Sequence, residues 1–523
     1  MRFIKGILIA LVALAVASSF AGCAVPNESS SKNATGPVPL ADSVASMQPR
    51  AVWQHFYDLT QVPRPSHHET TATAFVADFG RGLDLETTVD EVGNVIIRKP
   101  ATNGMEDRPG VVLQGHLDMV PQKSATSTVN FETDPIKAYV EDGWVHADGT
   151  TLGADDGIGV ALIMSILESQ DIAHGPLEAL FTVNEEDGFT GVNGLSADAL
   201  KGRLYINVDN ELEGQFLISS AGGVYVEARS TYDQMATPSG MTGFQVTVDG
   251  LAGGHSGVDI NKGRGSAHQI MARLLVNAPS ELGVRVSSVA GGEQRNAIPG
   301  RTTAIVAVPA SQAEAFGTYV SGFDKTVRSE LATADPGVAV TAKAADLPAK
   351  VMDASAQKAL IGAVYDVPQG VYSMSTEVPE LVETSGNLGV LSIGDGRFTG
   401  SVYVRSAKDP ERDAEAQRFA DVFKKAGITA TTEGAYSSWP PNPDSPLLAL
   451  MEQVYSESFD TTPAVAAIHA GLETSVAGVK FPGMDMISVG PTLQDVHTPQ
   501  ERLEVASVSR AYDLLVATLG KVK

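Results

Sequence analysis

Histidine and acidic residues recur next to the ends of predicted strands, and the first such stretch is Gly115-His116-Leu117-Asp118. It follows a short apolar run at 110–114 that is typical of a buried strand. A spacing of two residues places His116 and Asp118 on the same side of an extended chain. One of them can then bind a metal ion while the other orients the imidazole ring. Taken alone, a His-x-Asp pair is more often a surface or capping feature.

Four further stretches carry the same residue types in comparable positions. They are Asp155-Asp156 between glycines, Glu185-Glu186 after the apolar run 177–183, Asp209 after the run 204–208, and His497 near the C-terminus. Residues at the carboxyl ends of parallel strands face one crevice, so we expect these stretches to converge. Adjacent glutamates usually belong to a solvated surface, but five stretches in equivalent positions favour a shared site.

The residue types in these stretches indicate which metal they would hold. Imidazole and carboxylate together suit zinc, manganese or cobalt, whereas calcium prefers oxygen ligands alone. Two histidines with three or more carboxylates can hold two divalent ions that share one carboxylate. Such a pair activates water and polarises a carbonyl group, and a remaining glutamate is then free to act as general base.

The elements that would position these residues alternate between helix and strand from residue 49 onwards. Helices are predicted at 51–59, 67–79 and 158–167, between the apolar strands named above. Short apolar strands separated by helices indicate a largely parallel sheet covered on both faces. The expected fold class is therefore α/β, with a mixed, largely parallel sheet and helices on both of its faces.

After residue 220 the pattern of the chain changes. Several segments alternate apolar and polar residues, as half-exposed antiparallel strands do, around a predicted helix at 266–276; they are 243–248, 301–309, 337–342 and 400–405. We therefore expect an α+β lid or dimerisation domain at 221–407, inserted into a catalytic domain formed by 47–220 and 408–523. The chain is expected to end in a helix at 505–519.

Composition excludes several classes of protein. The chain has 523 residues, of which 43% are hydrophobic, so it can bury more than one core. Its net charge of −25 opposes binding to nucleic acid. A single cysteine excludes an intramolecular disulfide framework and a four-cysteine zinc site.

The N-terminus has the pattern of a bacterial export signal. Arg2 and Lys5 precede an uncharged apolar run at 7–16, which is short for a membrane span. Phe20-Ala21-Gly22-Cys23 then resembles a lipoprotein cleavage site, although Leu is more usual where Phe20 stands. We therefore expect a signal peptide at 1–22, lipidation of Cys23, a flexible tether at 23–46, and an exported enzyme anchored by lipid to the bacterial cell envelope.

Eight ordered motifs between residues 49 and 520 make the chain resemble a known family. These include Gln114-Gly115-His116-Leu117-Asp118, Leu152-Gly153-Ala154-Asp155-Asp156-Gly157, Asn184-Glu185-Glu186, Gly253-Gly254-His255-Ser256-Gly257, Arg295-Asn296-Ala297-Ile298-Pro299, His469-Ala470-Gly471-Leu472-Glu473 and Asp495-Val496-His497-Thr498-Pro499. The chain is similar to the aminoacyl-histidine dipeptidases (peptidase D, carnosinase-like), co-catalytic zinc peptidases of the aminoacylase and carboxypeptidase superfamily.

The resemblance implies a role for each residue of the strand-end stretches. Two divalent ions, expected to be zinc with manganese or cobalt as alternatives, would be bound by five ligands: His116, Asp155, Glu186, Asp209 and His497. Asp155 would bridge the two ions, and the peptide bond that follows it would be cis. Asp118 would orient His116, while Glu185 would act as the general base and then protonate the leaving amine.

The inserted domain would complete the site. By the resemblance, His255 stabilises the oxyanion of the tetrahedral intermediate, and in related homodimers the lid of one chain supplies this imidazole to the partner. Asn296 and Arg405 would grip the carboxylate end of a short peptide substrate, while His469 and Glu473 would line the pocket.

The chain departs from the family pattern in ways that bear on its substrate. Thr474-Ser475 stands where bacterial cytosolic members have Cys-Gly, Asp156 replaces an asparagine and adds a carboxylate, and the export signal is foreign to those enzymes. The expected function is an exported, lipid-anchored metallo-dipeptidase, acting on Xaa-His-type dipeptides. The alternatives are a metal-dependent deacylase or carboxypeptidase for N-acyl amino acids, and a binding lipoprotein without catalysis.

Overall fold

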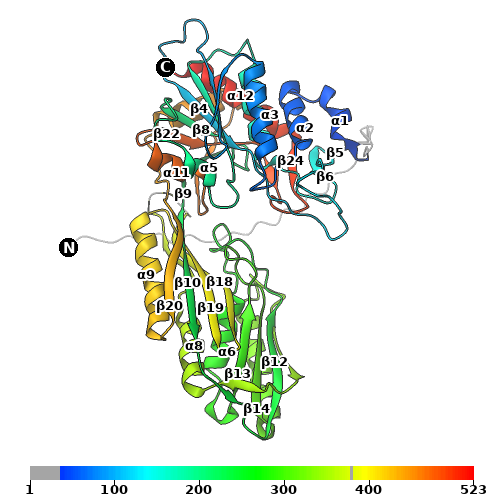
Figure 1. Ribbon diagram of the computed structural model, residues 1–523, viewed down its shortest axis with the longest axis vertical. Helices are drawn as coiled ribbons and strands as arrows, with labels where there is room; N and C mark the ends of the chain where they lie inside the picture. Colours follow the sequence, from blue (N-terminus) through cyan, green and yellow to red (C-terminus); the bar gives the residue numbers. More distant parts are fainter. Residues whose placement is uncertain (1–35, 377, 379–380) are drawn as a thin grey trace, which may run out of the picture. The chain divides into compact units, whose positions relative to one another are not determined.

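The computed structural model describes residues 36–376, 378 and 381–523. Contacts divide the chain into two units, Met1–Gly36 and Pro37–Lys523, and every helix and strand described lies in the second unit (Figure 1). The proposed signal peptide and Cys23 lie outside the described residues. Within the second unit, two large sheets each have a hydrophobic core of their own.

The first large sheet has eight strands, and its centre is parallel. In order across the sheet they are β2 (Glu86–Val89), β3 (Val95–Lys99), β7 (Leu177–Thr182), β4 (Val111–His116), β8 (Leu204–Asn207), β22 (Asp485–Ser488), β9 (Gln215–Ser220) and β21 (Ala464–Ile468). Strands β7, β4, β8 and β22 run parallel, whereas β2 pairs with β3, β3 with β7, and β9 with β22 in antiparallel fashion. All residues of β4 and β7 are buried, as expected for strands covered on both faces.

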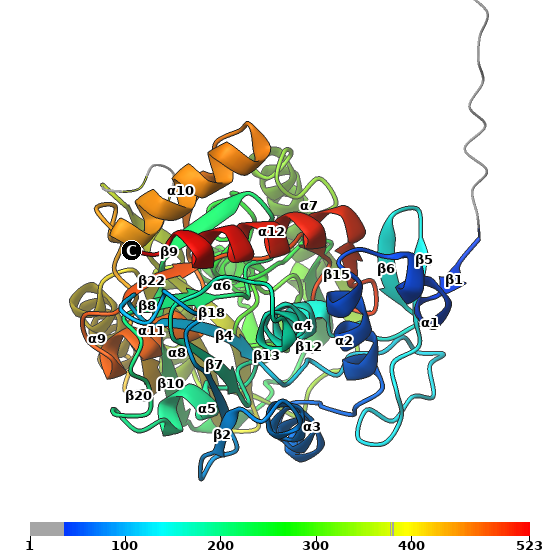
Figure 2. The same ribbon diagram turned by 90° about the horizontal axis from the view of Figure 1, so that it is seen from above.

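Helices cover both faces of this sheet, which confirms the predicted fold class. Neighbouring residues on β4 enter different cores, because successive side chains point to opposite faces: Leu113 joins the main core, and Val112 joins a second cluster with Val476. Helices α2 (Arg50–Thr60), α4 (Ala154–Glu168) and α12 (Val505–Lys521) contribute to the main core (Figure 2). Helix α11 (Glu473–Lys480) contributes Val476 on the other face.

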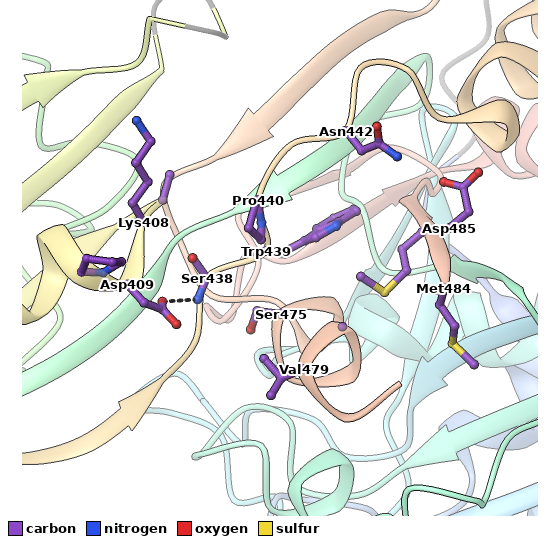
Figure 3. Close-up of a pocket in the computed structure, with 14 residues that line it drawn as sticks. Lys408, Asp409, Ser438, Trp439, Pro440, Asn442, Ser475, Val479, Met484 and Asp485 are labelled. Carbon is purple, nitrogen blue, oxygen red and sulfur yellow. Dashed lines mark hydrogen bonds between the residues drawn. The ribbon is translucent and has the colours of Figure 1, made fainter. Parts of the chain in front are cut away.

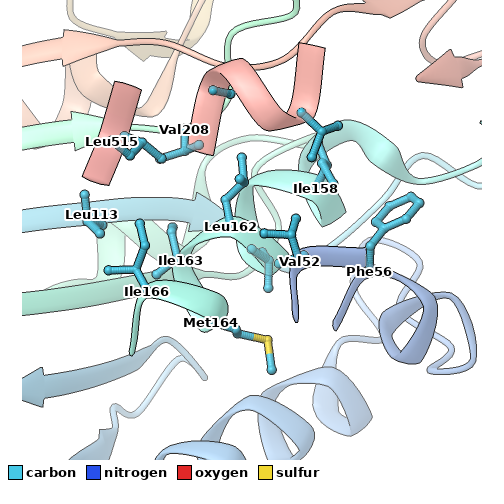
Figure 4. Packing of buried hydrophobic residues seen from close by; sticks show 14 of the residues in the cluster. Val52, Phe56, Leu113, Ile158, Leu162, Ile163, Met164, Ile166, Val208 and Leu515 are labelled. Atoms are coloured by element: carbon cyan, nitrogen blue, oxygen red, sulfur yellow. The ribbon is translucent and has the colours of Figure 1, made fainter. Parts of the chain in front are cut away.

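Helix α4 is the centre of the main core. It is apolar on every side, and its residues from Ile158 to Leu167 are all buried, as is expected of a helix hydrophobic all round. Figure 4 shows Ile158 and Leu162 of α4 among Phe56 of α2, Leu113 of β4 and Leu515 of α12. Burying each such side chain stabilises the fold by about 1.5–3 kcal/mol. This packing fixes the helix whose first turn carries Asp155.

The second large sheet is antiparallel and has nine strands. Eight of them follow the order β15 (Ala339–Ala345), β12 (Met241–Asp249), β14 (Thr302–Pro309), β13 (Arg285–Gly291), β18 (Val382–Gly394), β19 (Arg397–Ser406), β10 (Gly222–Thr231) and β20 (Thr429–Tyr436), and β17 (Gly370–Met374) pairs with β18. Helices α6 (Ala267–Val276), α7 (Ala313–Glu330), α8 (Ala354–Asp366) and α9 (Asp409–Lys425) share its core.

Two segments differ from their predicted places. Residues 409–436 form α9 and β20 on the second sheet, although the sequence assigned them to the second part of the catalytic domain. Residues 38–46, expected to belong to the tether, form β1 (Val38–Pro39), α1 (Leu40–Ser43) and a 3₁₀ turn (Val44–Ser46). Leu40 and Val44, with Met47 just after them, are buried in the main core, which attaches this segment to the first sheet.

Candidate metal centre and substrate site

The predicted metal ligands meet at the carboxyl edge of the first sheet. His116 is the last residue of β4, Glu186 follows β7, and Asp209 follows β8. Asp155 lies in the first turn of α4, and His497 lies in the loop after β23 (Leu493–Gln494). The rule that parallel strands point their carboxyl ends at one crevice thus accounts for three of the five positions.

The carboxylate of Asp155 lies between the two histidines. Its Oδ1 is 3.1 Å from Nε2 of His116, and its Oδ2 is 3.1 Å from Nε2 of His497. Asp209 Oδ1 lies 3.5 Å from Nε2 of His116, and Glu186 Oε2 lies 2.9 Å from Nε2 of His497. The ligand atoms therefore form two triads that share Asp155: one with His116 and Asp209, the other with Glu186 and His497, each with its atoms within 4.8 Å of one another.

The electrostatics of this cluster favour cations. Burial raises the pKa of Glu186 to about 7 and that of Asp209 to about 6. Burial lowers the pKa of His497, but its contacts with Asp155 and Glu186 outweigh this and raise it to about 12. Carboxylates are thus gathered where their charges are poorly solvated. The donor set of imidazole and carboxylate fits zinc, manganese or cobalt, and divalent ions would balance the charge.

Asp118 connects His116 to the loop that carries the two glutamates. Its Oδ1 lies 3.4 Å from Nδ1 of His116 and accepts a hydrogen bond of 2.9 Å from the backbone N–H of Glu185. Its Oδ2 accepts from the backbone N–H of Glu186 and from the hydroxyl of Ser66, at 3.2 and 2.8 Å. The Asp118 carboxylate therefore holds both the imidazole of His116 and the backbone of Glu185 and Glu186 in place.

Glu185 faces the same cluster without belonging to either triad around Asp155. One of its carboxylate oxygens lies within 4.8 Å of ligand atoms of His116 and Glu186. Burial raises its pKa well above the ordinary value. A carboxylate in this position can accept and return a proton beside the metal site.

The loop that carries Asp155 is held by two buried residues that the sequence reasoning missed. The carboxylate of Glu501 accepts hydrogen bonds from the backbone N–H groups of four consecutive residues, 152–155, at 2.7 to 3.3 Å. Arg64 donates to the carbonyl oxygens of Leu117, Asp118 and Gly153. Glu501 lies four residues after His497, and this proximity to a predicted ligand was the one signal that could have drawn attention to it.

Asp156 adds a carboxylate next to the cluster, as expected, and burial together with the charges of Asp209 and Asp155 raises its pKa well above the ordinary value. Its Oδ2 accepts a hydrogen bond of 3.1 Å from the backbone N–H of His116, and its side chain is buried. The carboxyl group therefore supports the end of β4 and takes no part in the ligand triads. The peptide bond between Asp155 and Asp156 is cis, as the resemblance implied.

His255 and Arg405, both from the second sheet and its loops, meet at 3.2 Å between Nε2 and Nη2. Nδ1 of His255 accepts hydrogen bonds from the backbone N–H groups of Gly257 and Val258, so Nε2 is the ring nitrogen that faces Arg405. An anion placed between the two groups would accept from the guanidinium and from a protonated Nε2. Burial and the charge of Arg405 lower the pKa of His255 to about 3, which keeps the ring neutral.

Arg405 is a buried guanidinium without a carboxylate partner among the described residues. It is 3% exposed, and it takes part in none of the ion pairs described. An uncompensated buried charge is costly, and an anion between Arg405 and His255 would remove that cost. The pair is therefore suited to hold an anionic group.

The other predicted substrate residues are placed differently from one another. His469 is buried, with Nε2 2.7 Å from the hydroxyl of Ser385, a neighbour of Arg405 across β18 and β19. Asn296 is exposed, and its carbonyl oxygen accepts from the backbone N–H of Ser256, next to His255. Glu473 has no exposed surface and accepts from Gln114 and Thr182, at 2.6 and 2.5 Å, so it lies beneath the site instead of lining a pocket.

A separate cavity of about 500 Å³ lies where the chain passes between the two sheets. Its walls are the residues after β19, the residues after β20, helix α11 and strand β22, with Trp439 and Val479 among them (Figure 3). None of the clustered histidines and carboxylates lines it. The metal centre is thus distinct from this cavity.

Comparison with known proteins gives consistent results. Residues 112–521 match the model of peptidase family M20/M25/M40. The cytosol non-specific dipeptidase of Escherichia coli (strain K12) is 36% identical over 479 residues, which are 92% of this chain and 99% of that protein. The crystal structure of aminoacylhistidine dipeptidase from Vibrio alginolyticus superimposes with a TM-score of 0.81 at 36% identity, covering 92% of this chain and 98% of that one. A tripeptidase from Staphylococcus aureus, at 15% identity and a TM-score of 0.56, shares the fold.

The comparison contradicts the prediction of an exported enzyme anchored by lipid through Cys23. The E. coli relative, matched over almost all of its length, is a cytosol enzyme by name. The prediction extended a local pattern at residues 1–23 to the whole protein, and that segment lies outside the described residues. Among the residues that the structure describes, no helix has the length and apolar character needed to cross a membrane.

Proposed function

The chain belongs to peptidase family M20/M25/M40 and is a metal-dependent hydrolase, and from this premise we propose that it cleaves dipeptides that have a free amino end. Two relatives of 36% identity, both matched over nearly their whole length, are named dipeptidases. Because one of them is named an aminoacylhistidine dipeptidase, Xaa-His dipeptides are the first substrates to test.

The position of Asp155 between His116 and His497 is the observation that carries this proposal. A single carboxylate that presents one oxygen to each of two imidazoles, 3.1 Å away on either side, is arranged to bridge two ions. Asp209 would complete one set of ligands and Glu186 the other. We propose zinc for both positions, with manganese or cobalt as alternatives.

Two divalent ions, when bound, would supply Lewis-acid activation of water and of the scissile carbonyl group. Glu185 would take the proton from the attacking water and pass it to the leaving amine, since its carboxylate faces the cluster without being part of the bridged triads. Asp118 would hold the imidazole of His116 and the backbone of Glu185 in fixed relative positions through the contacts described above.

The lid residues would bind the parts of the substrate that carry or acquire negative charge. Nε2–H of His255 is suited to the oxyanion that develops on the carbonyl oxygen, and the guanidinium of Arg405 is suited to the terminal carboxylate. Asn296 lies next to this pair through its backbone contact with Ser256. By the family resemblance we further propose a homodimer in which the lid of one subunit carries His255 to the other site.

A turnover assay of the metal-loaded enzyme tests the proposal. We expect hydrolysis of dipeptides with a free amino end, slower cleavage of tripeptides, and little activity on N-acyl amino acids. The control is the Glu185→Gln enzyme prepared in the same way, which reveals any contaminating peptidase. Preferential cleavage of N-acyl amino acids would instead assign the chain as a deacylase or carboxypeptidase, and metal binding without turnover of any substrate would leave only a binding function.

A further inference from the structure

Three side chains on the second sheet and one from the loop between β13 and β14 form a stack in which two guanidinium groups enclose two tyrosine rings. The guanidinium of Arg295 lies 4.1 Å from the ring of Tyr225, and that ring stacks on Tyr403 at 4.2 Å with 22° between the planes. The guanidinium of Arg405 lies 4.0 Å from the other side of Tyr403. We name these four residues, from Arg295 to Arg405, the arginine–tyrosine column.

We propose that the arginine–tyrosine column is a positioning device for the substrate's terminal carboxylate, and that Tyr403 determines how strictly the enzyme requires that carboxylate. The inference rests on the proposed function, because it assigns a support to Arg405 as the carboxylate-binding residue. Tyr403 acts through Arg405 and touches no reacting atom, so it is a positioning residue.

The register of the strands builds the column. Tyr225 on β10 lies directly opposite Tyr403 on β19, which brings the two rings into a cross-strand pair. Their neighbours Val224, Val226 and Val404 point to the opposite face, where they join the core shared with the helices. The column therefore lies on the face of the sheet that the helices leave uncovered.

The contact with a ring explains how Arg405 can be buried and yet free to bind an anion. A carboxylate partner would neutralise the guanidinium and compete with the substrate. The face of an aromatic ring attracts a cation without neutralising it, and guanidinium groups stack well on such rings. Tyr403 thus provides attraction and a fixed plane, while Nη2 of Arg405 lies beside His255 and its Nε has no hydrogen-bond partner among the described residues.

The column is held at its sides and at its far end. The hydroxyl of Tyr403 lies 2.9 Å from that of Tyr436, and a Cβ atom at Gly223 would come within 2.8 Å of the Tyr403 ring. At the far end, Arg295 is paired with Glu433 at 3.0 Å and Glu227 at 3.5 Å. These contacts leave the two rings little freedom to move, so the orientation of Arg405 is set before the substrate arrives.

The test compares a dipeptide with its C-terminal amide, which lacks the carboxylate charge. The measured quantity is the ratio of kcat/KM for the acid to kcat/KM for the amide. We expect Tyr403→Leu to lower this ratio about tenfold, mainly through KM for the acid, because a desolvated cation–π contact is lost. Tyr403→Phe keeps the ring and should keep the ratio within about twofold of the wild-type value.

Two further variants separate the possible outcomes. Tyr372, on β17 of the same sheet, has the guanidinium of Arg418 from α9 5.6 Å from its ring, and Tyr372→Leu should leave the ratio unchanged. Arg405→Met should abolish the preference for the acid. If Arg405→Met has this effect but Tyr403→Leu slows acid and amide equally, the column is merely structural and the inference is wrong, while the proposed function stands. If Arg405→Met leaves the preference intact, the assignment of Arg405 itself is wrong.

Discussion

Replacing Glu501 by glutamine should loosen the loop that carries the bridging carboxylate. In the wild type, Oε2 of Glu501 accepts from the backbone N–H groups of Leu152 and Gly153, at 2.7 and 3.0 Å, and Oε1 accepts from those of Ala154 and Asp155, at 2.7 and 3.3 Å. A glutamine side chain keeps one oxygen and turns an NH₂ donor towards two of these four donors. Two charge-assisted hydrogen bonds are then lost, and two N–H groups are left unpaired in a buried place.

The expected loss in the free energy of unfolding follows from those two hydrogen bonds and from the buried charge of Arg64 nearby. A hydrogen bond to a charged group contributes about 1.5–3 kcal/mol, so two of them give about 3–6 kcal/mol. The charge of Glu501 also opposes the lowering of the Arg64 pKa that burial causes, so the substitution leaves this guanidinium with less compensation. We therefore expect the free energy of unfolding of the metal-free protein to fall by about 4 kcal/mol.

Metal binding should weaken as well. Asp155 is placed by this loop, and residues that orient metal ligands typically change affinity by about 10–100-fold when they are substituted. Urea unfolding followed by circular dichroism in the presence of chelator measures the free energy of unfolding of the metal-free protein. Titration against a competing chelator measures the metal affinity. Glu504→Gln makes the same chemical change at a half-exposed residue outside this network and serves as the control. Stability within about 1 kcal/mol of the wild type, with unchanged metal affinity, would refute the reasoning.

Four other expectations concern the site and the core. Glu185→Gln should lower kcat by about 10²–10⁴-fold with metal content, measured by elemental analysis, unchanged; normal turnover would remove Glu185 as the base. Asp155→Ala should lose both ions on gel filtration, because a bridging ligand serves two charges at once, and retention of two ions per chain would place the bridge elsewhere. His255→Ala should lower kcat by about 10²–10³-fold with little change in KM, and mixing it with the inactive Glu185→Gln enzyme should restore activity only if the lid acts on the partner. Burial lowers the pKa of His268 to about 4, so between pH 6.5 and 4 the unfolded chain binds one more proton than the folded chain. The free energy of unfolding should therefore fall by up to about 3 kcal/mol as the pH drops through that range. His268→Gln should remove this part of the pH dependence in urea unfolding.

The sequence was sufficient to predict that the residues following the parallel strands come together. His116, Glu186 and Asp209 were expected to converge because parallel strands end at one edge of a sheet, and the structure brings them together with Asp155 and His497. This convergence requires only that the strands run parallel, which the alternation of apolar strands with helices indicated. The catalytic and ligand roles came from the family resemblance, and they stay predictions that the experiments above test.

Sequence patterns did not identify the residues that act through hydrogen bonds to the backbone. Glu501 stands in no recognisable motif, since its partners are N–H groups some 350 positions earlier in the chain, and backbone donors carry no sequence signal. Asp156 and Glu473 carry acidic side chains in the right motifs, yet one supports the backbone of His116 and the other lies fully buried against Gln114. Whether an acidic residue faces a site or supports it from below depends on side-chain direction, which spacing does not determine.

The position of β22 in the first sheet determines when the metal centre can form during synthesis. This strand, at Asp485–Ser488, lies between β8 and β9, whose residues precede it by more than 250 positions. Until β22 and the residues that follow it have been synthesised, the sheet lacks the strand that joins β8 to β9, and both His497 and Glu501 are missing from the loop around Asp155. Such long-range closure slows folding and leaves strand edges exposed in the nascent chain. A growing chain therefore cannot bring the five predicted ligands together before residue 497 has left the ribosome.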